Sequence, residues 1–357
     1  MEKGKHTQMD RRLRSESGVS LIQVAISIFV LTGFCAFVLD HGVLMVTRGQ
    51  SQNAADAAAL AGVITRVKDE PVATPAVDGI TEKVIQKSVD QHFIFGGTGA
   101  NTGRTWSWAC PTGISGWCVR VNVYRDGTTA GSTAVPVFFA NLFAITSQPM
   151  RATATAVAKA VNGSRCMKPW LIPDKWLEVQ APSNQFNPPN DDYVPYNYST
   201  NTPGSGYTLA DVGTTVVLRP GNPSGAISPS DFYEIETATD YEENIAKCQL
   251  EKKIGDVVQA LPGFREGPTD QGLTTLLQNG PVDVVIGMFN PEEFAAQDRQ
   301  SGTFPLTIVN MLSVRITSQQ NGRQISGTII GGIGDDMGPG PTPTGAGALT
   351  FAIQLVR

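Results

Sequence analysis

One uncharged stretch near the N-terminus constrains this chain more than any other feature. Residues 19–39 read VSLIQVAISIFVLTGFCAFVL and contain no charged side chain. About 20 apolar residues, at a rise of about 1.5 Å each, cross the hydrocarbon core of a bilayer. A cleavable signal peptide would have a shorter apolar core and a small-x-small site after it. Here Asp40, His41 and Gly42 follow directly, so we expect a retained transmembrane helix.

The charges on either side of this run predict its orientation. Arg48 is the one lysine or arginine within about twenty residues after the run, the distance over which flanking charge sets topology. Five basic residues precede the run: Lys3, Lys5, Arg11, Arg12 and Arg14. Because cytoplasmic flanks carry the excess of lysine and arginine, we expect residues 1–18 to be a cytoplasmic leader. The chain after Asp40 is then exported.

The helical pattern continues beyond the apolar run. Residues 48–62 read RGQSQNAADAAALAG, and no proline occurs from 43 to 67. Alanine has the highest helix propensity, and Pro71 then ends the pattern, which predicts a stem helix over residues 40–70. Small side chains let another backbone approach closely, and that backbone belongs either to the chain's own sheet or to neighbouring copies. The candidate packing residues are Ala54, Ala57, Ala58, Leu60, Ala61 and Ile64.

Export makes the cysteines informative. The chain has five, of which Cys35 lies in the apolar run. The other four are an even number in an oxidising compartment, which predicts two disulfides, with four reduced thiols as the alternative. Three pairings are open, and the pairing local in sequence joins Cys110 to Cys118 and Cys166 to Cys248. In the chain-entropy account, the longer loop would contribute about 4–5 kcal/mol.

The rest of the chain predicts an α+β fold class. Residues 80–93 suit a short helix or the entry to a strand, residues 117–125 and 149–161 alternate as strands do, and an apolar run covers residues 132–143. We assign these to an α+β unit at residues 71–162, built onto the transmembrane and stem helix.

Residues 163–357 predict a second, β-rich exported domain. Its Pro- and Asn-rich segment at residues 183–209 is expected at the surface. Strand candidates are residues 213–221, 280–289, 304–317 and 348–356, and short helix candidates are residues 240–250 and 271–280.

No motif in the chain predicts catalysis or a cofactor. His92 is the one histidine after residue 41, and no G-x-S-x-G elbow accompanies it. The glycine-rich loop at residues 96–105 lacks the glycine spacing and the lysine of a phosphate-binding loop. The aspartate pairs at 191–192 and 335–336 suit solvated turns, since neither has a calcium-loop pattern. We therefore expect no enzyme activity, cofactor or metal ion.

Nucleic acid is also not an expected partner. The net charge is −5, and no lysine- or arginine-rich run lies outside the N-terminal leader.

The start of the apolar run resembles the cleavage region of a type IV prepilin. The stretch SESGVSLIQ places Gly18 before the run and the polar Gln23 five positions into it. In prepilins a membrane peptidase cuts after this glycine, and a carboxylate at the fifth mature position can pair with a neighbour's new amino terminus. Gln23 is neutral and can only hydrogen-bond. Cleavage between Gly18 and Val19 is therefore a hypothesis, with an ordinary uncleaved anchor as the alternative.

Residues 14–62 as a whole, with Asp40 at the membrane exit and the QNAADAAALAG block, resemble TadE/TadG-type pilus-assembly proteins of the tight-adherence (Tad/Flp) system. The resemblance extends more loosely over residues 135–160 and over segments shared with the larger TadG-like members. Some large members carry a von Willebrand-type metal-binding module, but its D-x-S-x-S motif is missing here.

The resemblance implies a non-enzymatic component of a bacterial pilus-assembly apparatus, such as a minor pilin-like subunit of its base or tip. It implies an inner-membrane location, with the bulk of the chain in the periplasm or in an extracellular pilus. The partners it implies are other pilus-assembly or pilin-like subunits and the inner membrane, in a homo- or hetero-oligomer.

Two other function classes are left open. One is a surface adhesin or ligand-binding module that uses the aromatic segment at residues 193–207. The other is a periplasmic enzyme whose unrecognised site would include His92 or Asp335.

Overall fold

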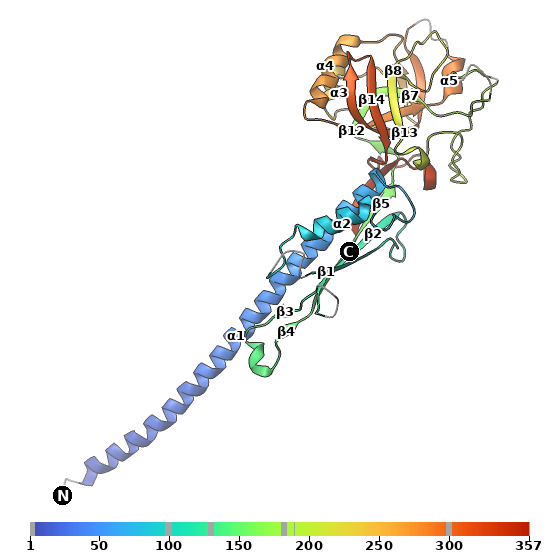
Figure 1. Ribbon diagram of the computed structural model, residues 1–357. Helices are drawn as coiled ribbons and strands as arrows, with labels where there is room; N and C mark the ends of the chain where they lie inside the picture. Colours follow the sequence, from blue (N-terminus) through green and yellow to red (C-terminus); the bar gives the residue numbers. More distant parts are fainter. Residues whose placement is uncertain are drawn as a thin grey trace. The chain divides into compact units, whose positions relative to one another are not determined.

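The computed structural model describes residues 4–96, 102–127, 132–179, 184–188, 190–297 and 302–356 (Figure 1). Residues 1–3 of the leader and 97–101 of the glycine-rich loop lie outside the described residues. The chain forms two compact units that interleave along the sequence. Unit 1 comprises Met1–Ala58, Gln86–Trp106 and Val121–Ala154, and unit 2 comprises Ala59–Ile85, Ser107–Arg120 and Thr155–Arg357. The domain boundaries inferred from the sequence stay a prediction.

A single helix, α1 (Gly4–Lys68), contains the predicted transmembrane and stem segments. Its 65 residues correspond to a length of about 100 Å. Arg66 and Lys68 lie in the last turn, where positive charge interacts favourably with the helix dipole. The long N-terminal helix expected from the sequence is confirmed, and it begins before residue 19.

The predicted elements between residues 80 and 161 form, with one correction. The helix is α2 (Ile80–Asp90), and the alternating segments are β2 (Trp117–Arg125) and β5 (Met150–Ala160). The apolar run at residues 132–143 is not a strand throughout. It forms β3 (Val135–Pro136) and then the 3-10 turn η2 (Ala140–Phe143), because its amides bind a side chain of α1 described below.

Two larger sheets hold most of the described strands, and β10 with β6 and β3 with β4 form two-stranded sheets. A five-stranded sheet has the order β1-β2-β5-β16-β15. A seven-stranded sheet in unit 2 has the order β11-β13-β12-β7-β9-β8-β14, and β14 also pairs with β13. The long strand β13 thereby closes six strands into a ring, which leaves those strands no free edge. The α+β arrangement with a second β-rich part is confirmed.

The remaining strand bounds are β1 (Gly103–Ser107), β4 (Ser147–Gln148), β6 (Gly163–Ser164), β7 (Met167–Pro173), β8 (Thr215–Pro220), β9 (Asp231–Glu234), β10 (Lys252–Lys253), β11 (Val257–Ala260), β12 (Val282–Phe289), β13 (Phe304–Gln320), β14 (Gln324–Ile330), β15 (Gly332–Ile333) and β16 (Thr350–Val356).

Short helices complete unit 2. They are α3 (Tyr241–Ala246), α4 (Glu266–Leu277) and α5 (Pro291–Ala296), with the 3-10 turns η3 (Leu209–Asp211) and η4 (Gly345–Gly347). Asp240 and Asn290 accept backbone N–H groups at the starts of α3 and α5. Figure 1 shows α3 and α4 together beside the seven-stranded sheet.

A buried carboxylate ties α4 to the sheet. Glu234 at the end of β9 is almost fully buried and accepts 2.7 Å and 3.0 Å hydrogen bonds from Arg265 Nε and Thr269 Oγ1. The Arg265 guanidinium also lies 3.7 Å from the centre of the Tyr241 ring. A buried charge is tolerated only with such partners, so this network fixes where α4 begins.

The described residues between 183 and 209 are mostly exposed, as predicted, but the core of unit 2 includes some of them. Phe186 and Tyr193, both in that segment, are buried in the core with Trp176 and the aromatic cluster around Phe289. Asp191 is buried as well and accepts the Val179 and Asn187 N–H groups, so it does not lie in a solvated turn. The polar composition of the segment gave no indication that Phe186 and Tyr193 belong to the core.

Two disulfides form, in the pairing local in sequence. Cys110 pairs with Cys118, across 8 positions, and Cys166 pairs with Cys248, across 82 positions. Cys35 is free and exposed on α1.

We predict that removing the long-loop disulfide costs more than removing the short-loop one. In the chain-entropy account the Cys166/Cys248→Ala pair loses about 4–5 kcal/mol and the Cys110/Cys118→Ala pair about 2–3 kcal/mol. Thermal unfolding of the full chain in detergent measures both. A larger loss for the short-loop variant would contradict this ranking.

Asp174, just after β7, is a buried carboxyl group without a cation bonded to it. It accepts hydrogen bonds from Lys175 N, Tyr207 N and Tyr193 Oη at 2.9–3.0 Å. Burial raises its pKa to about 6, against the lowering effect of these hydrogen bonds. The folded chain therefore binds a proton between about pH 4 and pH 6 that the unfolded chain does not bind.

The raised pKa of Asp174 determines how the free energy of unfolding changes with pH. The stability that comes from Asp174 is fully present below its ordinary pKa and is lost as the pH rises through about 6. Asp174→Asn, which is neutral throughout, should raise the free energy of unfolding at neutral pH by up to roughly 3 kcal/mol. Near pH 4 the gain should vanish. Asp192→Asn, at an exposed neighbour, is the matched control, and an equal gain at both pH values would contradict the account.

Candidate functional site

The first candidate region is the apolar half of α1. Among the described residues, Val19–Lys68 is the one helical stretch long and apolar enough to cross a membrane. Its side chains are uncovered: Leu21 is 72 %, Phe29 80 % and Phe37 69 % exposed. Exposed apolar area of this size is unfavourable in water and suits a hydrocarbon environment. The orientation in the membrane stays a prediction.

The candidate cleavage residues lie within this helix. Gly18 and Val19 are in uninterrupted α1, and Gln23 is exposed. No interaction of these residues bears on cleavage, which stays a prediction.

The alanine-rich block presents two different faces. Of the predicted packing residues, Ala54 and Ala58 are fully buried within the chain, whereas Ala57, Leu60, Ala61 and Ile64 are only half-buried. Gly62 explains part of the small-residue pattern, because a Cβ there would lie 2.7 Å from the Ile85 side chain. One face therefore packs on the chain itself, and the other remains partly accessible.

Asp40 is the most heavily bonded side chain near the membrane segment. Its Oδ1 accepts the Phe138 N–H at 2.8 Å, and its Oδ2 accepts the Phe139 and Ala140 N–H groups at 3.0 Å and 2.7 Å. These three successive amides open the η2 turn. Asp40 is 7 % exposed, so a carboxylate at the membrane exit is shielded by protein donors.

Arg66 closes the other end of the helix. It is 3 % exposed and donates from Nη1 to Cys118 O at 2.7 Å, and from Nε and Nη2 to Val72 O and from Nη2 to Ala73 O. Its guanidinium also lies 5.0 Å from the centre of the Trp117 ring. Burial lowers its pKa to about 10, which leaves it charged at neutral pH.

An ion cluster follows Arg66 at the end of α1. Lys68 Nζ lies 2.5 Å from Asp283 Oδ2, and Arg315 Nε donates to Asp283 Oδ1 at 2.8 Å. Arg315 Nη1 also lies 3.1 Å from Asp69. Burial favours the neutral form of Asp283, but the hydrogen bonds from Arg315 and Lys68 outweigh it, and its pKa is lowered.

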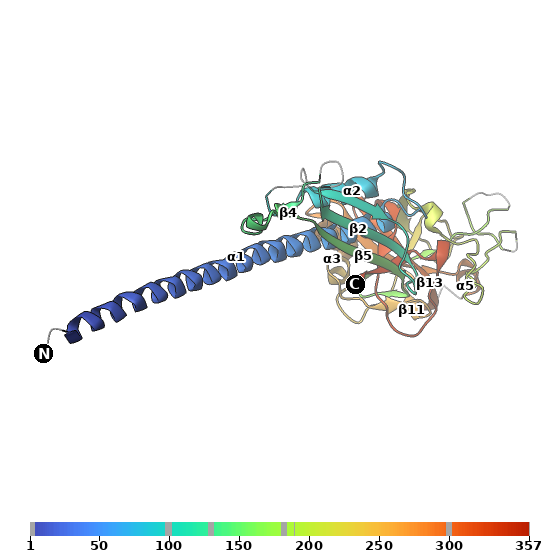
Figure 2. The same cartoon turned by 90° about the horizontal axis from the view of Figure 1, so that it is seen from below.

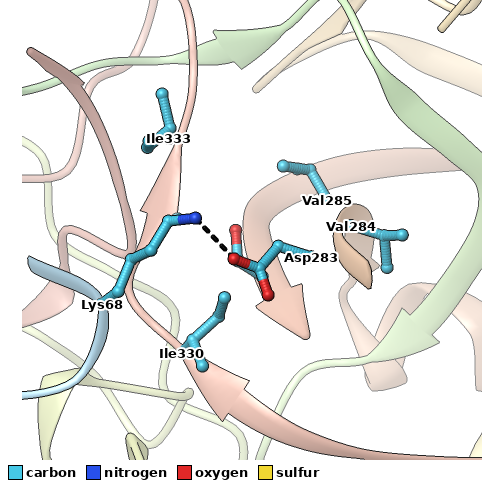
Figure 3. Close-up of a pocket in the computed structure, with 8 residues that line it drawn as sticks. Lys68, Asp283, Val284, Val285, Ile330 and Ile333 are labelled. Atoms are coloured by element: carbon cyan, nitrogen blue, oxygen red, sulfur yellow. Dashed lines mark hydrogen bonds and ion pairs between the residues drawn. The ribbon is translucent and has the colours of Figure 1, made fainter. Parts of the chain in front are cut away.

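Figure 3 shows Lys68 pointing at Asp283 over a small cavity of about 140 Å³, with Ile330 and Ile333 beside it. Gly331 contributes to the same region, since a Cβ there would collide with Val67 O. The carboxylate of Asp283 and the ammonium group of Lys68 form an ion pair with one another in this cavity. We therefore regard the cavity as a structural contact between the end of α1 and the strands β12 and β13.

The residues weighed for catalysis have structural partners within the chain. His92 Nδ1 lies 2.7 Å from Ser88 O, one turn earlier on the chain. Asp335 Oδ2 accepts the Arg165 N–H at 3.0 Å, and Asp336 Oδ1 accepts the Gly338 N–H. Within the described part of the chain, no group of three or more His, Cys, Asp or Glu side chains is arranged to hold a metal ion.

The tyrosines weighed for an adhesive surface hold their own segment in place. Tyr193 is buried, with its hydroxyl on Asp174. The hydroxyls of Tyr196 and Tyr198 donate to Thr344 O and Val309 O, and their rings lie 4.8 Å apart. These contacts give the tyrosines a structural role.

Two functional features escaped the sequence analysis. The Asp40 contacts join residues 98 to 100 positions apart, and no local pattern announces such a contact. Arg66 could have been noticed as a basic residue in the last helical turn, but nothing indicated its burial.

Comparison with known proteins agrees with the stem region. Residues 18–66 match the family model for putative Flp pilus-assembly TadE/G-like proteins. The resemblance inferred from the sequence is confirmed over that segment, which covers the apolar helix, Asp40 and the alanine-rich block. The match supports involvement in Flp pilus assembly. No curated protein and no solved structure matches the chain.

We predict that the ion cluster stabilises unit 2 through charge. Asp283→Asn keeps the shape of the side chain and removes the charge shared by Lys68 and Arg315, at an expected cost of about 1 kcal/mol. The cost should shrink in high salt, because screening weakens partly exposed pairs. Glu251→Gln, at an exposed carboxylate of the same unit, is the control. Thermal unfolding in detergent measures the loss of stability at low and high salt. A loss that does not depend on salt would indicate that Asp283 acts through packing instead.

Proposed function

We propose that this protein is a membrane-anchored, non-enzymatic component of a Flp pilus-assembly apparatus, in the role of a minor pilin-like subunit of its base or tip. The observation that carries the proposal is the family match at residues 18–66. The match coincides with an uncovered apolar helix that continues, without a break, into the alanine-rich block.

The proposed location is the bacterial inner membrane, crossed once by residues 19–39. The basic leader at residues 1–18 lies in the cytoplasm, and the bulk of the chain lies in the periplasm or in an extracellular pilus. The leader's positive charge supports this orientation. The two disulfides suit an oxidising compartment.

The proposed organisation follows the sequence boundaries. A stem at residues 40–70 leads into a pilin-like α+β domain at 71–162 and a β-rich exported domain at 163–357. A peptidase cut between Gly18 and Val19 would remove the leader, and Gln23 would then lie five positions into the mature chain, where it can hydrogen-bond but not form an ion pair.

The proposed partners are other pilus-assembly or pilin-like subunits, in a homo- or hetero-oligomer. The accessible stripe of Ala57, Leu60, Ala61 and Ile64 supports a packing seam, because these residues lie at helical spacing and stay half-buried in the isolated chain. The small side chains of Ala57 and Ala61 suit close approach of a second helix.

A strain without this chain should lose its pili, and the wild-type chain should restore them. In the same strain, Ala57→Leu/Ala61→Leu should restore few or no pili, because the larger side chains obstruct the proposed seam. Asn53→Leu, at an exposed position of the same helix, is the matched control and should restore normal numbers. Electron microscopy counts the pili, and thermal unfolding checks that the double variant folds.

Normal piliation in the deletion strain would contradict the proposed function. Normal piliation with Ala57→Leu/Ala61→Leu alone would contradict only the packing seam.

A further inference from the structure

One segment of unit 1 lies beside α1 near the apolar span. Residues 135–148, here called the hook, comprise β3, the η2 turn and β4. Figures 1 and 2 both draw the hook alongside α1, with η2 extending from β3 and β4 toward the N-terminal part of the helix. From residue 132 to residue 150 the sequence has no charged side chain. A surface turn of a water-soluble part is rarely so free of charge.

Six backbone N–H groups of the hook donate hydrogen bonds to partners within the protein. Asp40 accepts hydrogen bonds from three successive backbone N–H groups at the start of η2. Val137 N donates to Thr146 O at 3.2 Å, and Ala144 N and Ile145 N donate back into the turn at 3.0 Å and 3.2 Å. Irregular backbone can enter hydrocarbon only if its polar groups have protein partners, and the carboxylate of Asp40 supplies three at once.

An apolar groove of about 460 Å³ runs between the hook and α1. On the helix its lining extends from Phe29 to Leu44, and on the hook it includes Phe139 and Ile145. Phe29 lies eleven residues before Asp40, which is about 16 Å farther along the helix axis. That depth is roughly half the thickness of the hydrocarbon core.

The outer surface of the hook is apolar as well. Phe138 is 61 % exposed and Ile145 42 % exposed, although the backbone amide of each is hydrogen-bonded within the protein. The groove and these side chains are continuous with the uncovered face of α1 at Phe37. Surface of this kind is unfavourable in water and favourable among acyl chains.

We infer that the hook is a second membrane contact, inserted into the leaflet on the exported side, and that its groove takes a phospholipid acyl chain. The inference rests on the proposed membrane anchoring of α1. Asp40 positions the hook: its carboxylate satisfies three amides, and those amides compensate its charge near the lipid. Acyl chains are the favoured occupant because the groove extends to Phe29, which would lie inside the hydrocarbon core, where acyl chains surround the protein.

The test places one fluorophore at a time on the full chain in vesicles of phosphatidylethanolamine and phosphatidylglycerol. The native Cys35 thiol reports the span, Cys35→Ala/Ile145→Cys reports the hook, and Cys35→Ala/Val77→Cys is the control, because Val77 is an exposed apolar residue outside the hook. Lipids brominated at different acyl positions quench a fluorophore according to its depth.

The inference expects quenching of the label at residue 145 by acyl-brominated lipids, at a shallower depth than for Cys35, and no quenching at residue 77. A label at 145 that behaves like the one at 77, while Cys35 is quenched, would overturn the hook and leave the anchor intact. An unquenched Cys35 would overturn the anchoring itself. Protection of residue 145 together with its crosslinking to a second chain would replace lipid by a protein partner.

Asp40→Asn tests the positioning role. An amide nitrogen in place of one carboxylate oxygen faces backbone donors, so the hook should detach and the quenching at residue 145 should be lost, while the chain still floats with the vesicles. Asp56→Asn is the matched control on the same helix, since Asp56 accepts a hydrogen bond from Gln52 instead. Unchanged quenching in Asp40→Asn would overturn this role.

Discussion

Unit 2 depends on the hydrogen bonds that Arg66 makes from the last turn of α1. A helix end leaves its final carbonyl groups without partners in the helix, and the chain must turn sharply there toward Pro71. Arg66 makes that turn possible, because its buried guanidinium bonds the carbonyls of Val72, Ala73 and Cys118 together. The short disulfide holds Cys118 in place. The end of the helix is thereby bonded to the chain that follows it and to β2.

The same principle operates at Asp40, with the charges reversed. There a carboxylate gathers three backbone donors, whereas Arg66 gathers three backbone acceptors. In each case one ionised side chain of α1 satisfies several main-chain groups outside the helix, and charge-assisted hydrogen bonds of this kind are stronger than neutral ones. The helix therefore orders irregular chain at two points along its length.

Local regularity determined what the sequence could predict. The helix α1 and the alternating strands β2 and β5 follow patterns that lie within a few residues of one another, and the disulfides join cysteines that are consecutive among the four outside α1. Phe186 and Tyr193 were missed because a segment rich in Asn, Pro and Asp has a polar average, while burial is decided residue by residue. The hook was missed because its partner Asp40 is about 100 positions away.

The alanine-rich block shows that helical periodicity alone does not predict which partner each alanine faces. Periodicity predicts a stripe but not its direction relative to the sheet, and a shift of one residue turns the stripe by about 100°. Ala58 faces the chain and its neighbour Ala57 is half accessible, so one alanine-rich sequence supplies an internal and an external surface.

The partners of Lys68 and Asp69 also set an order of events during synthesis. Asp283 and Arg315 follow them by 215 and 246 positions, and the ribosome makes them long after the helix. The top of the helix therefore stays unfinished until most of the chain exists. A chain cut short before β13 would retain the apolar helix α1 but could not close the ring of six strands.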